Sequence, residues 1–225
     1  MLMITHLVGF GAAPGGGAAP TSYVFAGSDA DAPGNATSVS LNIAWGDEPP
    51  AGHTRHHIVG VGTIGSGGVP SSVTVGGDAA ILLVGGAGGG RTYSLWIVEK
   101  PTGTSGAVVV ASSDIDAILA AVWAGYNLQS TTPTDTAVDD DATAGASDLS
   151  LNVLDGGAVF FMGTRSGGVA DPVFVGVAED AEAIIGTAFR SWAASAFDVA
   201  AASPRTVTAT TGAGFQIPAV AASVR

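Results

Sequence analysis

The sequence lacks cysteine and has almost no lysine. None of its 225 residues is cysteine, which excludes disulfide frameworks and thiolate metal sites. Lysine and arginine together number 7 against 19 acidic residues, so the formal net charge is -12. Binding to nucleic acid through its phosphates requires a basic face. We therefore expect an acidic, solvated surface and no nucleic-acid partner.

Long apolar runs are missing as well. A helix that spans a bilayer needs roughly 20 consecutive apolar residues, and every apolar stretch here is far shorter. We therefore expect no membrane insertion. Residues 1–20 carry no Lys or Arg, and Thr5 and His6 interrupt their apolar stretch. Both features differ from those of a signal peptide, so secretion by that route is not expected.

Apolar and turn-forming residues are both abundant. Hydrophobic residues make up 47% of the chain, which is enough to bury a sizeable core and argues against global disorder. The 34 glycines and 11 prolines interrupt the backbone every few residues. This density leaves room for few helices of ordinary length and favours short strands joined by tight turns.

The strand pattern begins after residue 20. Val39, Leu41, Ile43 and Trp45 alternate with polar residues, which is typical of a strand with one buried face. Strands about 8–12 residues apart indicate a sandwich or barrel, and no helical period recurs between them. We predict an all-β fold, an antiparallel β-sandwich over 21–225. The predicted strands are 22–27, 37–45, 56–64, 72–75, 79–84, 91–100, 107–111, 117–124, 149–154, 158–163, 173–178, 189–196, 206–211 and 215–224.

Two segments of this block have a different character. Residues 127–147 are rich in Thr, Asp and Ala, and we expect them to form a long polar loop at the surface. Residues 180–185 fit one helical turn or a bulged strand, and the sequence leaves both open.

Residues 1–20 predict an N-terminal arm on a linker. A short apolar strand at 4–10 is followed by a run of only Gly, Ala and Pro at 11–20, which forms neither a helix nor a core. One interpretation is an arm that pairs with the edge strand of a neighbouring subunit; the other is a strand that folds back onto its own sheet. The expected anchoring residues are Ile4, Leu7, Val8 and Phe10.

Metal-binding patterns are weak. His53, His56 and His57 are close in sequence, but Arg55 stands between the two that would share a strand face. A permanent cation inside a ligand set disfavours a metal. The acidic groups at 29–31, 114–116 and 139–141 lack the spacing of a Ca²⁺ loop. We expect no metal site and no cofactor.

Catalytic patterns are equally weak. The segments 65–67 and 163–167 resemble fragments of a nucleophile elbow, without its strand-to-helix turn or a general base. A glycosidase needs two converging carboxylates, and Glu48, Glu99, Glu179 and Glu182 are the available glutamates. No spacing indicates that any two of them meet. We therefore expect no catalytic residue and no enzyme.

Saccharide binding would use an aromatic ring on an exposed face. The four tryptophans all lie in strand patterns, where core packing is the commoner use. Trp96 points away from the face formed by Tyr93, Leu95 and Ile97. It therefore lies either in the opposite layer or at the surface, and it is the one candidate for contact with a glycan.

Several strand and turn segments follow one another in a recognisable order. They are ITHLVGFG at 4–11, RHHIVGVG at 55–62, SVTVGGD at 72–78, SLWIV at 94–98 with PTG at 101–103, AVVV at 107–110, FRSW at 189–192 and TVTAT at 206–210. This order resembles jelly-roll proteins on the surface of tailed-phage and gene-transfer-agent particles, over nearly the whole chain from about residue 21. The resemblance implies a lectin-like jelly-roll sandwich used as a head spike, capsid decoration or tail-fibre component. It carries over no functional residues.

Three functional hypotheses follow. The leading one is a structural component on the outer surface of a phage-like virion, made in the host cytoplasm, held by its arm to other virion proteins and assembled as a homo-oligomer. The alternative is a carbohydrate-binding adhesin or receptor-binding module whose loops, such as 127–147, contact a host surface glycan. The third is a polysaccharide-degrading enzyme on the same scaffold.

Overall fold

The computed structural model describes residues 20–140, 146–165, 171–185, 189–211 and 217–225. Within these ranges the ordered elements are 17 β-strands, and no helix is present. Accordingly, no helix of the described residues could cross a membrane. The predicted all-β, antiparallel sandwich fold is confirmed.

The strands divide between two halves of the chain. Those of the first half are β1 (Ser22–Asp31), β2 (Ala36–Ala44), β3 (Arg55–Ile64), β4 (Ser72–Val75), β5 (Asp78–Ala79), β6 (Ile81–Gly88), β7 (Arg91–Glu99), β8 (Ser105–Ile115) and β9 (Ala117–Tyr126). Those of the second half are β10 (Asp135–Asp139), β11 (Ala146–Val153), β12 (Gly157–Arg165), β13 (Val173–Val175), β14 (Ala178–Ile185), β15 (Phe189–Val199), β16 (Ala202–Thr210) and β17 (Ala219–Val224).

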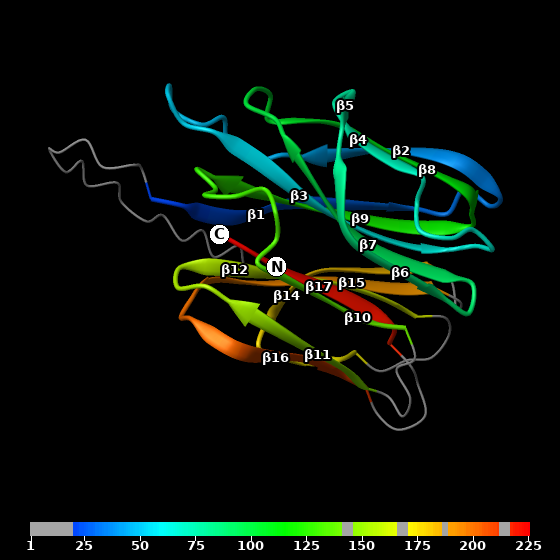
Figure 1. Cartoon of the computed structure of the whole chain (residues 1–225). Helices are drawn as coiled ribbons and strands as arrows, with labels where there is room; N and C mark the ends of the chain where they lie inside the picture. The colour runs from blue at the N-terminus through cyan, green and yellow to red at the C-terminus, as the bar shows by residue number, and fades with distance from the viewer. Residues whose placement is uncertain (1–19, 141–145, 166–170, 186–188, 212–216) are drawn as a thin grey trace, which may run out of the picture.

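These strands form four sheets stacked in layers (Figure 1). Sheet A has the order β1-β9-β3-β7-β6, and sheet B has the order β2-β8-β4-β5. Sheet C has the order β10-β17-β12-β15-β14, and sheet D has the order β11-β16-β13. The layers follow one another as B, A, C, D. Sheets A and B form a first sandwich, and sheets C and D form a second.

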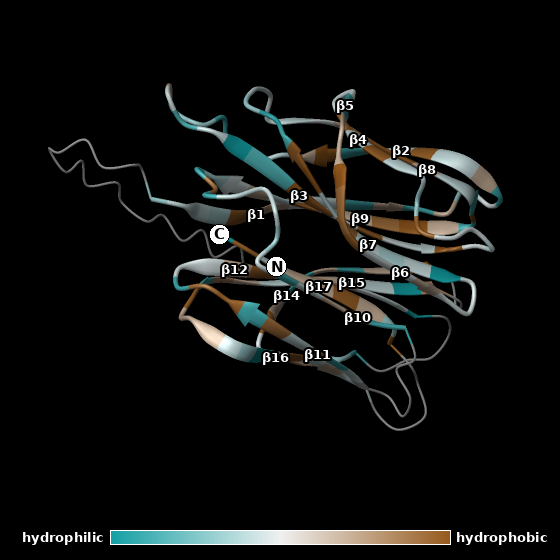
Figure 2. Cartoon of the chain, in the orientation of Figure 1, coloured by the Kyte–Doolittle hydropathy of each residue, from teal (hydrophilic) through white to brown (hydrophobic). Residues whose placement is uncertain are grey.

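Three buried hydrophobic cores fill the spaces between the four sheets. The first outer core joins sheets B and A around Leu41 and Trp96, and the second outer core joins sheets C and D around Leu151 and Trp192. A central core joins sheets A and C around Trp123. Hydrophobic segments run along the strands of all four layers (Figure 2). Sheets A and C therefore bury both faces, which explains the continuous apolar runs of β3, β9 and β12.

The two sandwiches have the same strand order. If β1, β3, β6, β7 and β9 are replaced by β10, β12, β14, β15 and β17, the order of sheet A becomes that of sheet C. Likewise, if β2, β4 and β8 are replaced by β11, β13 and β16, the order β2-β8-β4 of sheet B becomes the order of sheet D. In the second half the first, eighth, third and sixth strands are neighbours in one sheet, and the second, seventh and fourth in the other. In the first half the additional short strand β5 shifts the count by one, so the equivalents are the first, ninth, third and seventh strands, and the second, eighth and fourth. This is the strand order of a jelly roll.

Short stretches of sequence match at equivalent places in the two halves. Ser-Leu-Asn stands at 40–42 in β2 and again at 150–152 in β11, and the leucine is buried in both. Ser-Gly-Gly-Val follows β3 at 66–69 and follows β12 at 166–169. Common strand order and these matches indicate an internal duplication, which the sequence analysis did not detect.

The two copies face each other across a pseudo-two-fold axis. At the centre, β3 packs against its own counterpart β12; at the edges, β1 contacts β14 and β6 contacts β10. Because β14 is the counterpart of β6 and β10 that of β1, exchange of the two sandwiches restores the same arrangement. The chain therefore contains, within itself, an isologous interface of the kind found in symmetric dimers.

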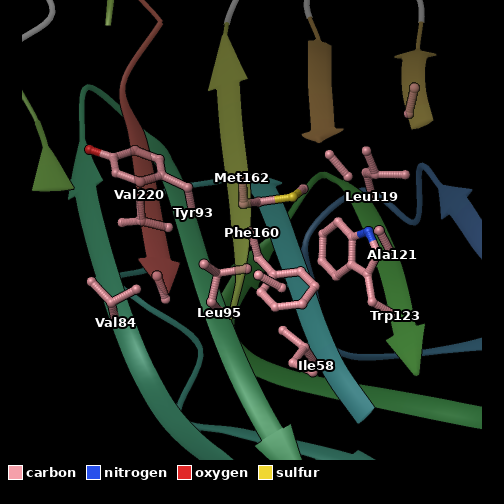
Figure 3. Close-up of a cluster of buried hydrophobic side chains, with 14 of the residues drawn as sticks. Ile58, Val84, Tyr93, Leu95, Leu119, Ala121, Trp123, Phe160, Met162 and Val220 are labelled. Atoms are coloured by element: carbon pink, nitrogen blue, oxygen red, sulfur yellow. The ribbon is translucent and has the colours of Figure 1, made fainter. Parts of the chain in front are cut away.

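The central core depends on a close approach of β3 to sheet C (Figure 3). Trp123 and Phe160 have ring centroids 5.2 Å apart across the two sheets. The Met162 side chain extends toward β3 and packs against Gly60 and Gly62, which have no side chain to obstruct it. A Cβ at Gly62 would collide with the hydroxyls of Thr164 and Ser191 and lie 2.8 Å from Met162 Cε. Glycine is required here for space rather than for backbone conformation.

The structure corrects one expectation and refines another. The segment 127–147 is not a continuous loop, because residues 135–139 form β10, which pairs with β17 and packs Ala137 against the second outer core. This strand lies at the edge of sheet C, and its aspartates and threonine give it the composition of a loop. A single sandwich has two layers, whereas the block after residue 20 has four, because it contains two sandwiches. The treatment of 21–225 as one domain stays a prediction. Of the two forms left open for 180–185, the bulged strand is confirmed.

We predict that Gly62→Ala destabilises the protein by about 2 kcal/mol, because the added methyl overpacks the central core. The matched control is Gly68→Ala, since a Cβ at Gly68 meets nothing within 4 Å. Urea denaturation of both variants measures the difference. Equal free energies of unfolding for the two variants would contradict the assigned packing of sheets A and C.

Candidate functional site

A shallow hollow lies at the edge of the second sandwich, where the end of β15 runs past the start of β14. On its β14 side, β15 has no paired strand among the described residues beyond Ser195, which pairs with Ala178 at the start of β14; on its other side it stays paired with β12. The hollow is wide open to solvent and has a volume of about 620 Å³. It is lined by Gly176, Val177, Ala178, Asp180, Ser195, Ala196, Phe197, Val199 and Arg205.

Two irregularities of the strands shape this hollow. In β14 the register with β15 skips Asp180, which is left unpaired between Glu179 and Ala181. In β15 the register with β12 shifts where Phe197 and Asp198 lie, and Asp198 has a positive φ of 51°. Bulges re-aim side chains and are common next to functional sites, and a non-glycine residue with positive φ is uncommon. Both distortions coincide with residues of the hollow.

The carboxyl of Asp180 is fixed by hydrogen bonds from two neighbouring side chains. The indole Nε1–H of Trp123 donates a hydrogen bond of 2.8 Å to Asp180 Oδ2, and the Ser195 hydroxyl also bonds this carboxyl. Burial raises the pKa of Asp180, and the two hydrogen bonds partly oppose that shift. The side chain is therefore fixed in direction, while part of its acceptor capacity stays unused.

Arg205 and Phe197 form two further walls. Arg205 donates from Nε and Nη2 to the carbonyl of Gly176, at 3.3 and 2.7 Å. Gly176 has a φ of 85°, which favours glycine at this turn. The ring of Phe197 stacks on Tyr23, with centroids 5.8 Å apart and planes 15° apart. Each wall is thus held by a contact outside the hollow.

The first sandwich is filled at the topologically equivalent place. There the turn after β4 contains Gly76, with a φ of 55°, and Lys100 Nζ donates to its carbonyl at 3.3 Å. Trp45 occupies the adjoining space, since its ring lies closest to a Cβ built at Gly76 or Gly106. After β11, the counterpart of β2, the chain has exposed Leu154 and Asp155 instead of a buried tryptophan. The second sandwich therefore stays open where the first is closed.

The structure places the predicted contact residues as follows. Ile4, Leu7, Val8 and Phe10 of the arm lie outside the described residues. Trp96 occupies the opposite layer, one of the two places that the alternation allowed. It is 5% exposed in the first outer core and donates from Nε1 to Ser94 Oγ at 2.8 Å. Its position therefore gives no support to a role in glycan contact.

The histidine cluster surrounds a structural arginine. Arg55 is completely buried, and its guanidinium is fixed by backbone carbonyls instead of carboxylates. The acceptors are those of Gly46, Asp47, Lys100, Thr102 and Gly103. This arginine joins two loops at the end of the first sandwich. His57 beside it is also buried and donates from Nε2 to the Trp45 carbonyl at 3.0 Å.

Two of the acidic groups make hydrogen bonds within the chain. Asp114 accepts two hydrogen bonds of 2.6 Å from the backbone N–H and hydroxyl of Ser66, which lower its pKa. Asp140 accepts a bond from the Tyr93 hydroxyl, between the two sandwiches. Over the described ranges no three His, Asp or Glu side chains gather as a metal ligand set would.

The four glutamates lie in two places. Glu48 and Glu99 belong to the first sandwich, where Glu48 accepts a bond from the Gly103 N–H. Glu179 and Glu182 share β14. Burial raises the pKa of both, and repulsion from Glu182 adds to the rise at Glu179. Glu182 pairs with Arg190 at 2.8 Å. The structure thus brings together only the second pair, on one strand beside an arginine.

Sequence reasoning did not find the residues of the hollow. Asp180 stands among other acidic residues of β14, and Phe197 and Arg205 are single residues near strand ends. The only available signal was the ambiguous pattern of 180–185, which reflects the bulge at Asp180. The convergence of these side chains depends on strand pairings that no local pattern encodes.

Comparisons of the chain with protein-family models, with curated proteins and with solved structures found no match. The class of the protein is therefore defined by its own architecture. It is an all-β protein of two stacked jelly-roll sandwiches, with one open and one closed end at equivalent places.

We predict that His57 makes the protein less stable as the pH falls. Burial, with the nearby charges of Arg55 and Lys100, lowers the pKa of His57 from 6.5 to about 4. Between these values the unfolded chain binds a proton that folded His57 does not, so the free energy of unfolding decreases as pH falls from 6.5 to about 4. The decrease is up to about 3 kcal/mol, and His56 adds to it in the same direction.

The measurement is denaturant unfolding of the wild type and of His57→Gln across this pH range. Glutamine keeps a donor for the Trp45 carbonyl and does not titrate. The stability difference between the two proteins is expected to shrink toward low pH. A difference independent of pH would contradict the burial of a neutral His57.

We predict that Asp180→Leu costs about 2 kcal/mol, since it leaves the Trp123 indole N–H without its acceptor. Asp180→Asn retains an oxygen for that bond and is expected to cost less than half as much. Guanidinium denaturation compares the two variants. If Asp180→Leu unfolds at the denaturant midpoint of the wild type, the indole bond is not a stabilising contact.

Proposed function

We propose that this protein is a structural component on the outer surface of a phage-like particle, a head spike, capsid decoration or tail protein that assembles as a homo-oligomer. The observation that carries the proposal is the jelly-roll strand order, present twice in one chain. Jelly rolls recur in capsid and lectin domains. Because one fold supports many functions, the proposal also rests on the surface and the build of this chain.

Three continuous cores give the rigidity expected of a structural part. The outer strands add surfaces suited to neighbouring copies. Ser38, Ser40 and Asn42 point outward from β2, and Thr206 and Thr210 point outward from β16. These side chains are short and uncharged, so a second copy could pack on them without burying a charge. Repeated subunits of this kind usually close into symmetric assemblies.

The arm supplies the attachment in this proposal. An apolar strand beyond a linker of Gly, Ala and Pro can pair with the edge of a neighbouring sheet, as in strand addition. The sheet edge to which the arm binds would belong to another virion protein, of the capsid or tail. The proposed location is the virion surface.

A carbohydrate-binding adhesin is the second candidate, favoured by the hollow at Asp180, Phe197 and Arg205. The two candidates are compatible, because a surface component can also contact a host glycan. The enzyme hypothesis needs two carboxylates that converge on a bond. Glu179 and Glu182 lie on one strand, with Glu182 paired to Arg190, which does not favour it.

We predict that the protein co-purifies with particles from cultures of its source organism and that immunogold labels their outer surface. In the matched test, Leu7→Asp with Phe10→Asp in the arm is expected to reduce incorporation at least tenfold. Thr5→Asn is the control, and thermal unfolding of the purified variants checks that the body is unchanged. Absence from purified particles would overturn the proposal, and normal incorporation of the arm variant would overturn the anchoring role.

A further inference from the structure

The geometry points to the Asp180–Phe197–Arg205 hollow as a binding site for a neutral saccharide, one pyranose residue or the end of a glycan chain. This inference deepens the proposed surface function, since it names the class of molecule that the surface would contact. It rests on three properties of the hollow: its fixed polar groups, its aromatic wall and its charge.

The two polar groups are pre-oriented and have unused capacity. An ionised carboxyl offers about four lone-pair sites, and Asp180 uses only those facing Trp123 and Ser195. A guanidinium has five N–H donors, and Arg205 uses two on the Gly176 carbonyl. Vicinal sugar hydroxyls both donate and accept, so they match an acceptor and a donor that line one hollow. Prior fixation of both side chains lowers the entropy lost on binding.

The aromatic wall suits the C–H face of a pyranose. Phe197 lines the hollow, and its stacking on Tyr23 fixes the plane of the ring. A sugar ring packs its apolar face on such a surface while its hydroxyls reach polar groups at the side.

Charge selects among saccharides. Asp180 lines the hollow, Glu179 adjoins it in sequence and Asp198 follows Phe197, against Arg205 as the lining cation. Burial and repulsion from its acidic neighbours, Asp180 among them, raise the pKa of Glu179, so a further carboxylate is disfavoured there. An acidic sugar would add such a charge. We therefore infer a preference for neutral hexoses over uronic acids.

The closed first sandwich strengthens this assignment. It also has a positive-φ glycine at this turn with a cation on the glycine carbonyl, although the cation is Lys100 after β7 and not a residue equivalent to Arg205 of β16. Yet Trp45 fills the space. The fold therefore does not require an opening at this place. The hollow is a property of the second sandwich, formed where the tryptophan is missing and where two bulges re-aim Asp180 and Phe197.

The test is saturation-transfer NMR on the full chain with glucose, galactose, mannose, N-acetylglucosamine and glucuronate. A monosaccharide of about 12 non-hydrogen atoms binds with a millimolar Kd at ordinary ligand efficiency. At least one neutral sugar is expected to give signals. Glucuronate, which differs from glucose by its carboxylate, is expected to give signals at least fivefold weaker.

Variants locate the site. Ala178→Trp places a ring in the hollow, as Trp45 does in the first sandwich, and is expected to reduce the signals at least fivefold. Asp180→Asn keeps the indole bond, tests the carboxylate if Ala178→Trp fails to fold, and is expected to reduce the signals similarly. Lys100→Gln changes the cation that bonds the Gly76 carbonyl of the closed sandwich and is expected to leave the signals unchanged.

Three outcomes would overturn the inference: no signal from any neutral sugar, equal signals from folded Ala178→Trp or Asp180→Asn and from the wild type, or glucuronate signals as strong as those of glucose. The purified chain suffices for this test. A protein that is found on particles but binds no sugar would therefore refute only the saccharide site. A protein that binds sugar but is absent from particles would refute only the proposed virion role.

Discussion

The close approach of β3 to β12 determines how the two sandwiches fit together. Both strands lie in the middle of their sheets, so the spacing between them sets the spacing of sheets A and C. Gly60 and Gly62 leave room on β3 for Met162 and for the Trp123 ring. A side chain at Gly62 would push against Thr164 and Ser191. The central core, and with it the pseudo-two-fold arrangement, depends on these two glycines.

This central packing has a consequence for the rest of the surface. Sheets A and C are buried on both faces, so new functions can arise only on sheets B and D, at strand edges and at the ends of the sandwiches. The two copies use their ends differently. In the first, Arg55 joins two loops through five carbonyls and Trp45 fills the space beside them. In the second, the equivalent space is the hollow beside Asp180.

Much of the fold could be predicted from sequence, because alternation and turn residues are local signals. Val39, Leu41 and Ile43 all enter the first outer core, as their spacing indicates. Edge strands are harder to predict from sequence. Residues 135–139 read as loop because Asp135, Thr136 and Asp139 are polar, and only pairing with β17 makes them a strand. The four-layer stack was missed for a related reason, since a strand buried on both faces, such as β9, carries no alternation to say which sheets cover it.

The hollow could not be predicted, because its residues lie far apart in sequence and each has an ordinary local explanation. Asp180 reads as one acid among several in 179–182, and Arg205 as a polar residue after Pro204. They come together only in the folded chain, where residues of β14, β15 and β16 line one hollow. The second sandwich supplies a comparison that a single one would lack: a turn with a positive-φ glycine occurs at equivalent places in both, and a cation bonds the glycine carbonyl in each, Lys100 in one and Arg205 from a different strand in the other. The space beside this turn is filled in the first sandwich and open in the second. The two sandwiches therefore share the glycine turn and differ in whether a side chain fills the space beside it.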